Sequence, residues 1–251
     1  MKAMILSAGL GTRLRPLTNH IPKALVTVNN KPLIQHIIEK LIAFGINEII
    51  INVHHLAEQI TDFIQSKKFF DIKIEFSCET TLLETGGGLK KAAWFFKGNE
   101  PFVLYNVDVL SDIDLGKMLL IHKDRKAFAT LAVRNRKTSR YLLFDKNDRF
   151  IGWEILNGDK SGRSIIKDAE IVKSLSFMGI HIISPEILTK MPEKDIFSII
   201  EFYLDLAQKG VTIQAFHADS YYWFDLGKQQ NIKEANHYLQ SIQSGTLSPA
   251  R

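Results

Sequence analysis

Cysteine is almost absent from this sequence: Cys78 is the single cysteine in 251 residues. One cysteine excludes a disulfide within the chain and fits a reducing compartment. Long hydrophobic runs are missing too, because no apolar stretch approaches the length of a membrane span and the first residues show no signal-peptide pattern. We therefore expect a cytoplasmic location and no membrane partner.

A concentration of charge of one sign is also missing. The 32 Lys and Arg residues exceed the 27 Asp and Glu residues to give a net charge of +5, and no basic tail collects the excess. A moderate, dispersed excess suits a small polyanionic ligand better than nucleic acid, which we expect the protein not to bind. Hydrophobic residues make up 45% of the chain, which is enough for a core and indicates a folded protein.

Two familiar phosphate-binding motifs are absent from the N-terminal glycine loop. A dinucleotide-binding loop needs glycine at position 14, which is Leu14, and the P-loop pattern does not occur. The short apolar run 3–6 predicts a buried strand, and small residues follow it at once. Backbone N–H groups in such a loop form an anion-binding nest, which glycine leaves open to a phosphate. Positive charge follows at Arg13, Arg15 and Lys23, so the stretch predicts a polyphosphate site.

A carboxylate is expected to face this loop. The run 101–106 predicts a strand, and Asp108 follows directly after it. In a doubly wound sheet of order 3-2-1-4, the first and fourth strands are neighbours and their carboxyl ends flank the ligand crevice. A carboxylate opposite a phosphate would repel it unless a cation lay between them, and Mg²⁺ suits both kinds of oxygen. Asp112 and Asp114 fit a turn or a helix N-cap better.

Hydrophobic periodicity predicts the remaining elements. Helices are expected from 31 to 45 and over 56–64, 89–96, 115–121, 196–208 and 229–243. Strands are expected over 48–53, 73–76, 127–133, 175–183 and 211–217, with a hairpin that pairs 141–144 with 150–153. Three consecutive glycines place 77–88 as a loop, with backbone open to a nucleobase or ribose, and the polar tail 244–251 is expected to be flexible.

Four stretches together resemble one protein family. They are G-x-G-T-R-x-x-P-x-T over 9–18 followed by Pro22-Lys23, LETGGG over 83–88, F-x-G-I-H over 177–181, and W-x-D-x-G over 223–227. The resemblance is to the sugar-nucleotide pyrophosphorylases, nucleotidyltransferases that join a sugar 1-phosphate to a nucleoside triphosphate. The LETGGG string and the TSRYLLF run at 138–144 are most similar to the N-acetylmuramate 1-phosphate uridylyltransferase branch.

The resemblance implies a Rossmann-like nucleotidyltransferase fold with a doubly wound, mainly parallel α/β sheet and a small sugar-binding insertion. It implies one domain over 1–243, with a nucleotide-binding half (1–126) and a sugar-phosphate-binding half (127–243). The implied reaction joins a sugar 1-phosphate to an NTP with release of pyrophosphate, uses Mg²⁺, and is carried out by a monomer or homodimer. The branch favours UTP and N-acetylmuramate 1-phosphate, which points to recycling of cell-wall peptidoglycan.

The resemblance also implies roles for individual residues. The catalytic residues would be Arg13, Lys23 and Asp108, and the metal ligands Asp108 and Asp225. The nucleotide-binding residues would be Ala8, Gly9, Gly11, Thr12, Arg13, Glu79, Gly86, Gly87 and Gly88. The substrate-binding residues would be Asn106, Glu154 and Gly179.

The sequence departs from the family pattern at two places. Val107 stands where the family usually has glycine in Asn-Gly-Asp, which removes a close approach of backbone to the sugar. The Glu-Lys-Pro segment that typically holds the sugar phosphate is missing, and Glu154, Lys167 and Lys173 are the candidates to replace it.

Several alternatives stay open. Within the class, the protein could be a mannose 1-phosphate guanylyltransferase or a glucose 1-phosphate thymidylyltransferase, although the missing Glu-Lys-Pro segment counts against the latter. A glycosyltransferase that uses nucleotide sugars usually carries D-x-D where this chain has N-V-D. A non-catalytic regulatory module that binds nucleotide sugars would release no pyrophosphate.

Overall fold

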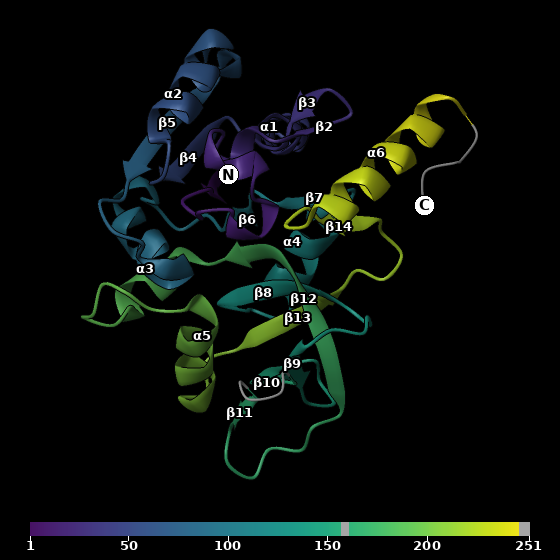
Figure 1. Ribbon diagram of the computed structural model, residues 1–251. Helices are drawn as coiled ribbons and strands as arrows, with labels where there is room; N and C mark the ends of the chain where they lie inside the picture. The colour runs from purple at the N-terminus through teal and green to yellow at the C-terminus, as the bar shows by residue number, and fades with distance from the viewer. Residues whose placement is uncertain (157–160, 246–251) are drawn as a thin grey trace. The chain divides into compact units, whose positions relative to one another are not determined.

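The computed structural model describes residues 1–156 and 161–245, and these residues form two compact units (Figure 1). The first unit comprises 1–82, 105–113 and the described residues from Ser220 onward, and the second comprises 83–104 and the described residues of 114–219. The halves expected from the sequence, 1–126 and 127–243, are contiguous, whereas each unit is assembled from separate stretches. Of the tail expected to be flexible, residues 246–251 lie outside the described residues.

The first unit has a parallel sheet with the predicted strand order. Strands β1 (Lys2–Leu6), β4 (Glu48–Val53) and β5 (Lys73–Cys78) pair in parallel, and the end of β6 (Phe102–Asn106) lies beside β1. Counted along the chain, the order β5-β4-β1-β6 is 3-2-1-4. Leu6, Asn52 and Ser77 are level with one another, so the carboxyl ends of three strands form one edge.

Three helices and two small sheets complete the first unit. The helices are α1 (Leu33–Ala43), α2 (Ala57–Ser66) and α6 (Gln229–Gln243), each within a few residues of its predicted range. Strand β2 (Thr27–Val28) pairs with β3 (Lys31–Pro32), and β7 (Val109–Ser111) pairs with β14 (Trp223–Asp225). Neither pair was predicted, because strands of two or three residues carry too little periodicity, and residues 31–32 of the predicted helix belong to β3.

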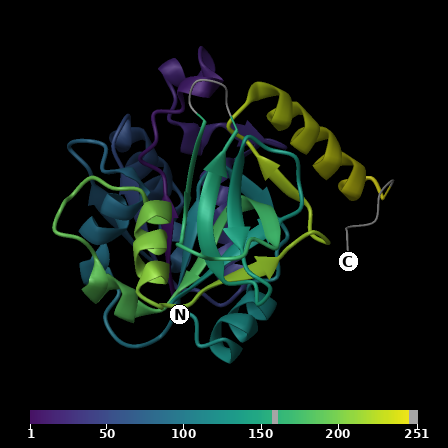
Figure 2. The same ribbon diagram turned by 90° about the horizontal axis from the view of Figure 1, so that it is seen from below.

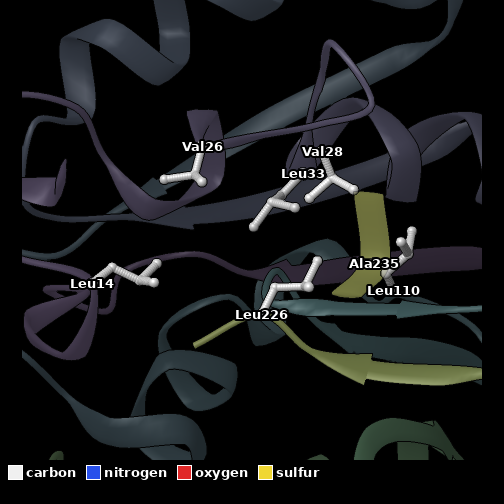
Figure 3. Packing of buried hydrophobic residues seen from close by; sticks show 7 residues of the cluster. All are labelled: Leu14, Val26, Val28, Leu33, Leu110, Leu226 and Ala235. Carbon is white, nitrogen blue, oxygen red and sulfur yellow. The ribbon is translucent and has the colours of Figure 1, made fainter. Parts of the chain in front are cut away.

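A cluster of buried apolar side chains in the first unit joins segments that are far apart in the sequence (Figure 3). Three of its leucines, each at most 7% exposed, lie within two positions of a charged candidate residue. They are Leu14 after Arg13, Leu110 after Asp108 and Leu226 after Asp225. Val26, Val28, Leu33 and Ala235 complete the cluster. Burying a leucine stabilises a fold by about 1.5–3 kcal/mol. The packing energy of this cluster therefore holds in place the backbone that carries three charged candidates.

The second unit contains mostly antiparallel strands. Strand β12 (Lys173–Ile183) pairs antiparallel with β8 (Ala129–Arg134) and β9 (Arg140–Phe144), and the predicted hairpin joins β9 to β10 (Phe150–Ile155). Strand β11 (Gly162–Ile165) pairs with β10, β13 (Ile213–His217) runs parallel to β8, and β6 is the neighbour of β12 in the strand order. Helix α4 (Leu115–Asp124) is capped as predicted by Asp114, which accepts a 2.9 Å hydrogen bond from the Lys117 N–H.

The glycine-rich stretch is a helix, so the prediction of a loop over 77–88 and a helix over 89–96 is wrong. Helix α3 (Glu84–Lys91) contains all three glycines, and it packs against α5 (Ile199–Gln208), the green helix beside the strands in Figure 2. A Cβ at Gly87 would lie 2.0 Å from the Asp195 carbonyl oxygen, and one at Gly86 would lie 2.4 Å from the Phe197 ring. Close packing therefore outweighs the poor helix propensity of glycine.

Among the described residues, no helix combines the length and apolar character needed to cross a bilayer.

Candidate active site

The loop after β1 leaves backbone open, as the sequence predicted. Gly11 has φ +63°, a left-handed conformation that favours glycine, and begins the short 3₁₀ turn Thr12–Leu14. Its carbonyl accepts a 2.8 Å hydrogen bond from the Thr18 hydroxyl. A Cβ at Gly9 would meet nothing within 4 Å, so that part of the loop is accessible to a ligand.

The pairing of β7 with β14 brings two carboxylates together. Asp108 lies in the turn between β6 and β7, and Asp225 is the last residue of β14. Asp225 pairs with Val109 across the two strands, and the Leu226 N–H donates to the Asp108 carbonyl at 2.8 Å. Residues separated by more than a hundred positions are therefore joined through backbone hydrogen bonds.

Two cations face these carboxylates. Lys23 is almost buried, with 11% of its side chain exposed, and its ammonium group donates to Asp108 Oδ2. The Arg13 guanidinium lies between both acids, 3.9 Å from Asp108 Oδ2 and 3.8 Å from Asp225 Oδ2. The Arg13 side chain is 56% exposed, so a ligand can reach it. The structure thus brings Arg13, Lys23, Asp108 and Asp225 into one cluster, all within the first unit.

Glycine at position 227 makes the close approach of Arg13 possible. A Cβ there would lie 2.4 Å from Arg13 Nη2 and 2.9 Å from Asp225 Oδ1. The Gly227 N–H also donates to Asp225 Oδ1 at 3.0 Å, and the Asn231 amide donates to the Asp225 carbonyl at 2.6 Å. The glycine of the W-x-D-x-G string therefore has a local role that the sequence alone did not reveal.

The two carboxylates fit a magnesium ion that is shared with a ligand. Within residues 1–156 and 161–245, no group of three or more His, Cys, Asp or Glu side chains could hold a metal. Mg²⁺ is commonly bound through one or two carboxylates, with phosphate oxygens and water supplying its other ligands. Asp108 and Asp225 match that donor set, and the guanidinium between them shows that a positive charge is favourable there.

Two other predicted residues of the first unit lie at the same strand edge. Asn106 ends β6, and its side-chain oxygen is buried without a hydrogen-bond partner. Glu79 follows β5 and is only 6% exposed; its Oε1 accepts a 2.7 Å hydrogen bond from Asn52. Asn52 was missed by the sequence reasoning, although a polar residue near the end of the apolar run 48–53 was the available signal.

The remaining predicted residues belong to the second unit. Gly179 has φ +76° and lies in β12 where the register shifts, so backbone geometry explains the glycine. Glu154 lies on β10, and its Oε1 is 3.8 Å from the Arg163 side chain. Of the two lysines that are candidates to replace the missing segment, Lys173 forms an ion pair with Asp148 at 2.7 Å and Lys167 is exposed.

Sequence comparison identifies the family. A sequence model of the nucleotidyl transferase family matches residues 2–150. The chain belongs to this family. The matched region includes the glycine loop after β1, Lys23 and Asp108, whereas Asp225 lies outside it.

Two curated proteins illustrate the similarity of this chain to named enzymes. It is 30% identical to a UTP–glucose-1-phosphate uridylyltransferase of Synechocystis sp. over 94% of the chain and 62% of that protein. It is 31% identical to a mannose-1-phosphate guanyltransferase of Yarrowia lipolytica over 96% of the chain and 65% of that protein. The chain thus spans slightly less than two thirds of the length of these relatives.

Solved structures show the same α/β fold. The structure of HddC from Yersinia pseudotuberculosis complexed with GMP-PN matches with a TM-score of 0.73 and 23% identity, over 95% of this chain and 99% of that one. A UDP-glucose pyrophosphorylase from Acinetobacter baumanii matches with a TM-score of 0.75 and 18% identity, over 98% and 99% of the two chains. The expected α/β class with a mainly parallel central sheet is confirmed.

Proposed function

We propose that the protein is a sugar-1-phosphate nucleotidyltransferase. The observation that carries the proposal is the cluster of Arg13 and Lys23 with Asp108 and Asp225 at the carboxyl edge of the first-unit sheet. A glycine loop with open backbone at Gly9 ends at Gly11, two positions before Arg13. Cations, carboxylates and an anion-binding loop at one sheet edge are the parts that phosphoryl chemistry requires.

The reaction needs positioning and charge neutralisation. A phosphate oxygen of the sugar 1-phosphate attacks the α-phosphorus of the NTP, and the bond from that phosphorus to the oxygen bridging to the β-phosphorus breaks. Pyrophosphate leaves with the electron pair. The attacking oxygen is already anionic, so no general base is required, and in-line placement with neutralisation of the leaving charge supplies the catalysis.

Each residue of the cluster has a role in this scheme. The backbone of Ala8, Gly9, Gly11 and Thr12, with the Arg13 guanidinium, holds the β- and γ-phosphates. Lys23 moves from Asp108 to pair with the reacting phosphates. Asp108 and Asp225 would hold Mg²⁺, which when bound neutralises charge on the phosphate oxygens.

Contacts with the base and the sugar remain predictions. Glu79 and Gly86–Gly88 are proposed to contact the nucleobase, although packing alone already accounts for Gly86 and Gly87. Asn106, Glu154 and Gly179 are proposed to contact the sugar. A cavity of about 270 Å³ in the second unit supports a sugar site near Glu154, because its lining includes apolar side chains as well as Arg140, Glu154 and Glu201. Its apolar lining residues are Leu142, Trp153, Ile155, Phe177 and Ile200.

We infer UTP and N-acetylmuramate 1-phosphate as the substrates. The lactyl carboxylate of muramate is a suitable partner for Arg140, and its acetyl group fits an apolar wall. Because one of the relatives is a mannose-1-phosphate guanyltransferase, transfer from GTP to mannose 1-phosphate is the alternative within the class. A regulatory module that only binds nucleotide sugars is the alternative of another class.

A pyrophosphate-release screen with Mg²⁺ tests the proposal. It pairs UTP, GTP, dTTP and CTP with the 1-phosphates of N-acetylmuramate, mannose, glucose and N-acetylglucosamine. Release with UTP and the muramate phosphate alone supports the full proposal, and release with another pair supports the class but changes the substrates. Absence of release with every pair contradicts the enzyme and favours the binding module.

A further inference from the structure

A chain of two buried hydrogen bonds connects the loop after β1 (residues 7–11), which is proposed to bind the phosphates, to β4 and to the residue that follows β5. The Ser7 N–H, the first after β1, donates to Asn52 Oδ1 at 2.6 Å. The Asn52 amide in turn donates to Glu79 Oε1 at 2.7 Å. The three residues are 6%, 3% and 6% exposed, respectively, so water does not compete strongly for these bonds.

The chemistry of the two partners fixes the orientation of the Asn52 amide. A backbone N–H can only donate, and an ionised carboxylate can only accept. A flipped amide would face the Ser7 N–H with its own NH₂ group and would face Glu79 with its oxygen. Both bonds would be lost in a buried place, which is costly for each polar group. Glu79 therefore determines which atom of Asn52 faces the loop.

Glu79 is itself held by its backbone. Its N–H donates to the Val53 carbonyl at 2.8 Å, and its carbonyl lies 2.8 Å from His54 Nδ1, which donates to it. Glu79 therefore forms hydrogen bonds with three consecutive residues at the end of β4 and just after it: Asn52, Val53 and His54. The backbone of Glu79 is thus fixed to this segment, and its side chain reaches Asn52 from a defined position.

The loop is anchored at its two ends and open between them. At the first end, the Ser7 N–H is bound to Asn52. At the second end, the Gly11 carbonyl accepts a 2.8 Å hydrogen bond from the Thr18 hydroxyl and a 2.9 Å hydrogen bond from the Leu14 N–H. Between these anchors Ala8 is buried, at 7% exposed, whereas Leu10 is 37% exposed and a Cβ at Gly9 would meet nothing within 4 Å. With so little packing around Gly9 and Leu10, the anchors determine where the N–H groups of that part of the loop point.

We propose that Asn52, oriented by Glu79, is a positioning residue for the triphosphate: it sets the backbone of the loop that binds the phosphates. This inference rests on the proposed function. Asn52 touches no reacting atom in this scheme and acts only through the Ser7 N–H. It adds to the site a residue that the sequence patterns did not single out.

A pair of complementary substitutions tests the proposal. In Asn52→Asp the new carboxylate can still accept from Ser7, but it offers no donor to Glu79 and repels its charge. In Glu79→Gln the amide oxygen can still accept from Asn52. In the double variant, the glutamine amide can donate to the aspartate, so the chain of hydrogen bonds is restored with its donor reversed.

The readouts are kcat and KM for each substrate, and the Kd for UTP and for GTP in the presence of Mg²⁺. We expect Asn52→Asp to lower kcat/KM for the NTP by about 10- to 100-fold, the effect of misplacing a binding group by a fraction of an ångström to one ångström. NTP affinity weakens in parallel, and the KM for the sugar phosphate stays unchanged. The double variant returns to the values of Glu79→Gln alone.

Thr130→Val is the matched control. Thr130 is fully buried in the second unit and hydrogen-bonded to His122 at 3.0 Å, so its loss also removes a buried hydrogen bond. We expect it to lower Tm and leave NTP kinetics unchanged. Should Asn52→Asp fail to fold, Asn52→Ser removes both side-chain bonds without adding charge, and its NTP kinetics and affinity are compared with those of the wild type.

Two results would overturn the proposal. One is a folded Asn52→Asp protein with wild-type NTP affinity and kinetics, and the other is a folded double variant that fails to recover. The wild-type protein is assayed alongside. Lack of turnover there contradicts the proposed function, while the NTP affinities still decide whether Asn52 positions the loop.

Discussion

Replacing Gly227 with alanine crowds Arg13 away from the carboxylates without replacing any charged residue. The added Cβ would lie 2.4 Å from Arg13 Nη2 and 2.8 Å from its Cζ, distances that no real contact sustains, and it would also lie 2.9 Å from Asp225 Oδ1. Gly227 is not among the glycines with positive φ, so the backbone accepts alanine. The clash falls mainly on the far end of a flexible, half-exposed side chain, which moves instead of the backbone.

The expected effects on stability and activity therefore differ. Exposed ion pairs contribute about 0–1 kcal/mol, so losing the Arg13 contacts changes the free energy of unfolding by no more than that. Removing a charge-assisted contact to the transition state lowers turnover by about 100-fold, or about 2.7 kcal/mol. We predict a Tm close to wild type and a turnover reduced to roughly one per cent.

The assay is pyrophosphate release at saturating sugar phosphate, with Tm measured on the same preparations. Gly162→Ala is the control, because its Cβ would meet only ordinary contacts of 3.6 and 3.7 Å. Combining Gly227→Ala with Arg13→Ala should add little to the loss caused by Arg13→Ala, since both act on one side chain. Wild-type turnover in a folded Gly227→Ala protein would refute the assignment of Arg13.

Three further predictions concern Arg13, Gly87 and His122. Arg13→Ala removes a positive charge 3.8–3.9 Å from both carboxylates, so Mn²⁺ should bind the nucleotide-free protein about tenfold more tightly by calorimetry; unchanged affinity would contradict a metal site there. Gly87→Ala should lower the free energy of unfolding, measured in urea, by more than about 2 kcal/mol, because a Cβ 2.0 Å from the Asp195 carbonyl oxygen forces α3 to shift. An unchanged free energy of unfolding would show that packing does not require this glycine. Burial lowers the pKa of His122 to about 4, so as pH falls the unfolded chain binds a proton at this residue before the folded protein does. The contribution of His122 to the free energy of unfolding should therefore fall by at most about 1.4 kcal/mol per pH unit as pH drops from 6.5 to 4, and His122→Gln should make the measured slope shallower by up to that amount.

The sequence predicted the parts of the fold that follow from periodicity. The strand 48–53 and the helix 229–243 were predicted with the boundaries that the structure shows. The order 3-2-1-4 and the placement of Asp108 at the sheet edge follow from the rules of doubly wound sheets. These features depend on local apolar patterns and on topology, which a single sequence carries.

Other features depend on contacts between distant segments. The three glycines lie in α3 because the backbone near Asp195 and Phe197 passes close to them. That segment is more than a hundred residues away in the sequence, so no local pattern around the glycines predicts the contact. The meeting of Asp108 with Asp225 required a motif resemblance, since the short pair β7–β14 leaves no periodic signal. The role of Asn52 likewise appears only once β1, β4 and β5 are aligned.

The most direct test of the account is the turnover of Asp108→Asn. The substitution keeps the size of the side chain and removes the charge that faces Lys23 and Arg13. Pyrophosphate release is measured with the best substrate pair from the screen, and the fold is checked by Tm and circular dichroism. The account predicts a folded protein whose turnover is lost by at least about 100-fold. A folded Asp108→Asn protein with near-wild-type turnover would contradict the central claim that this cluster is the catalytic centre.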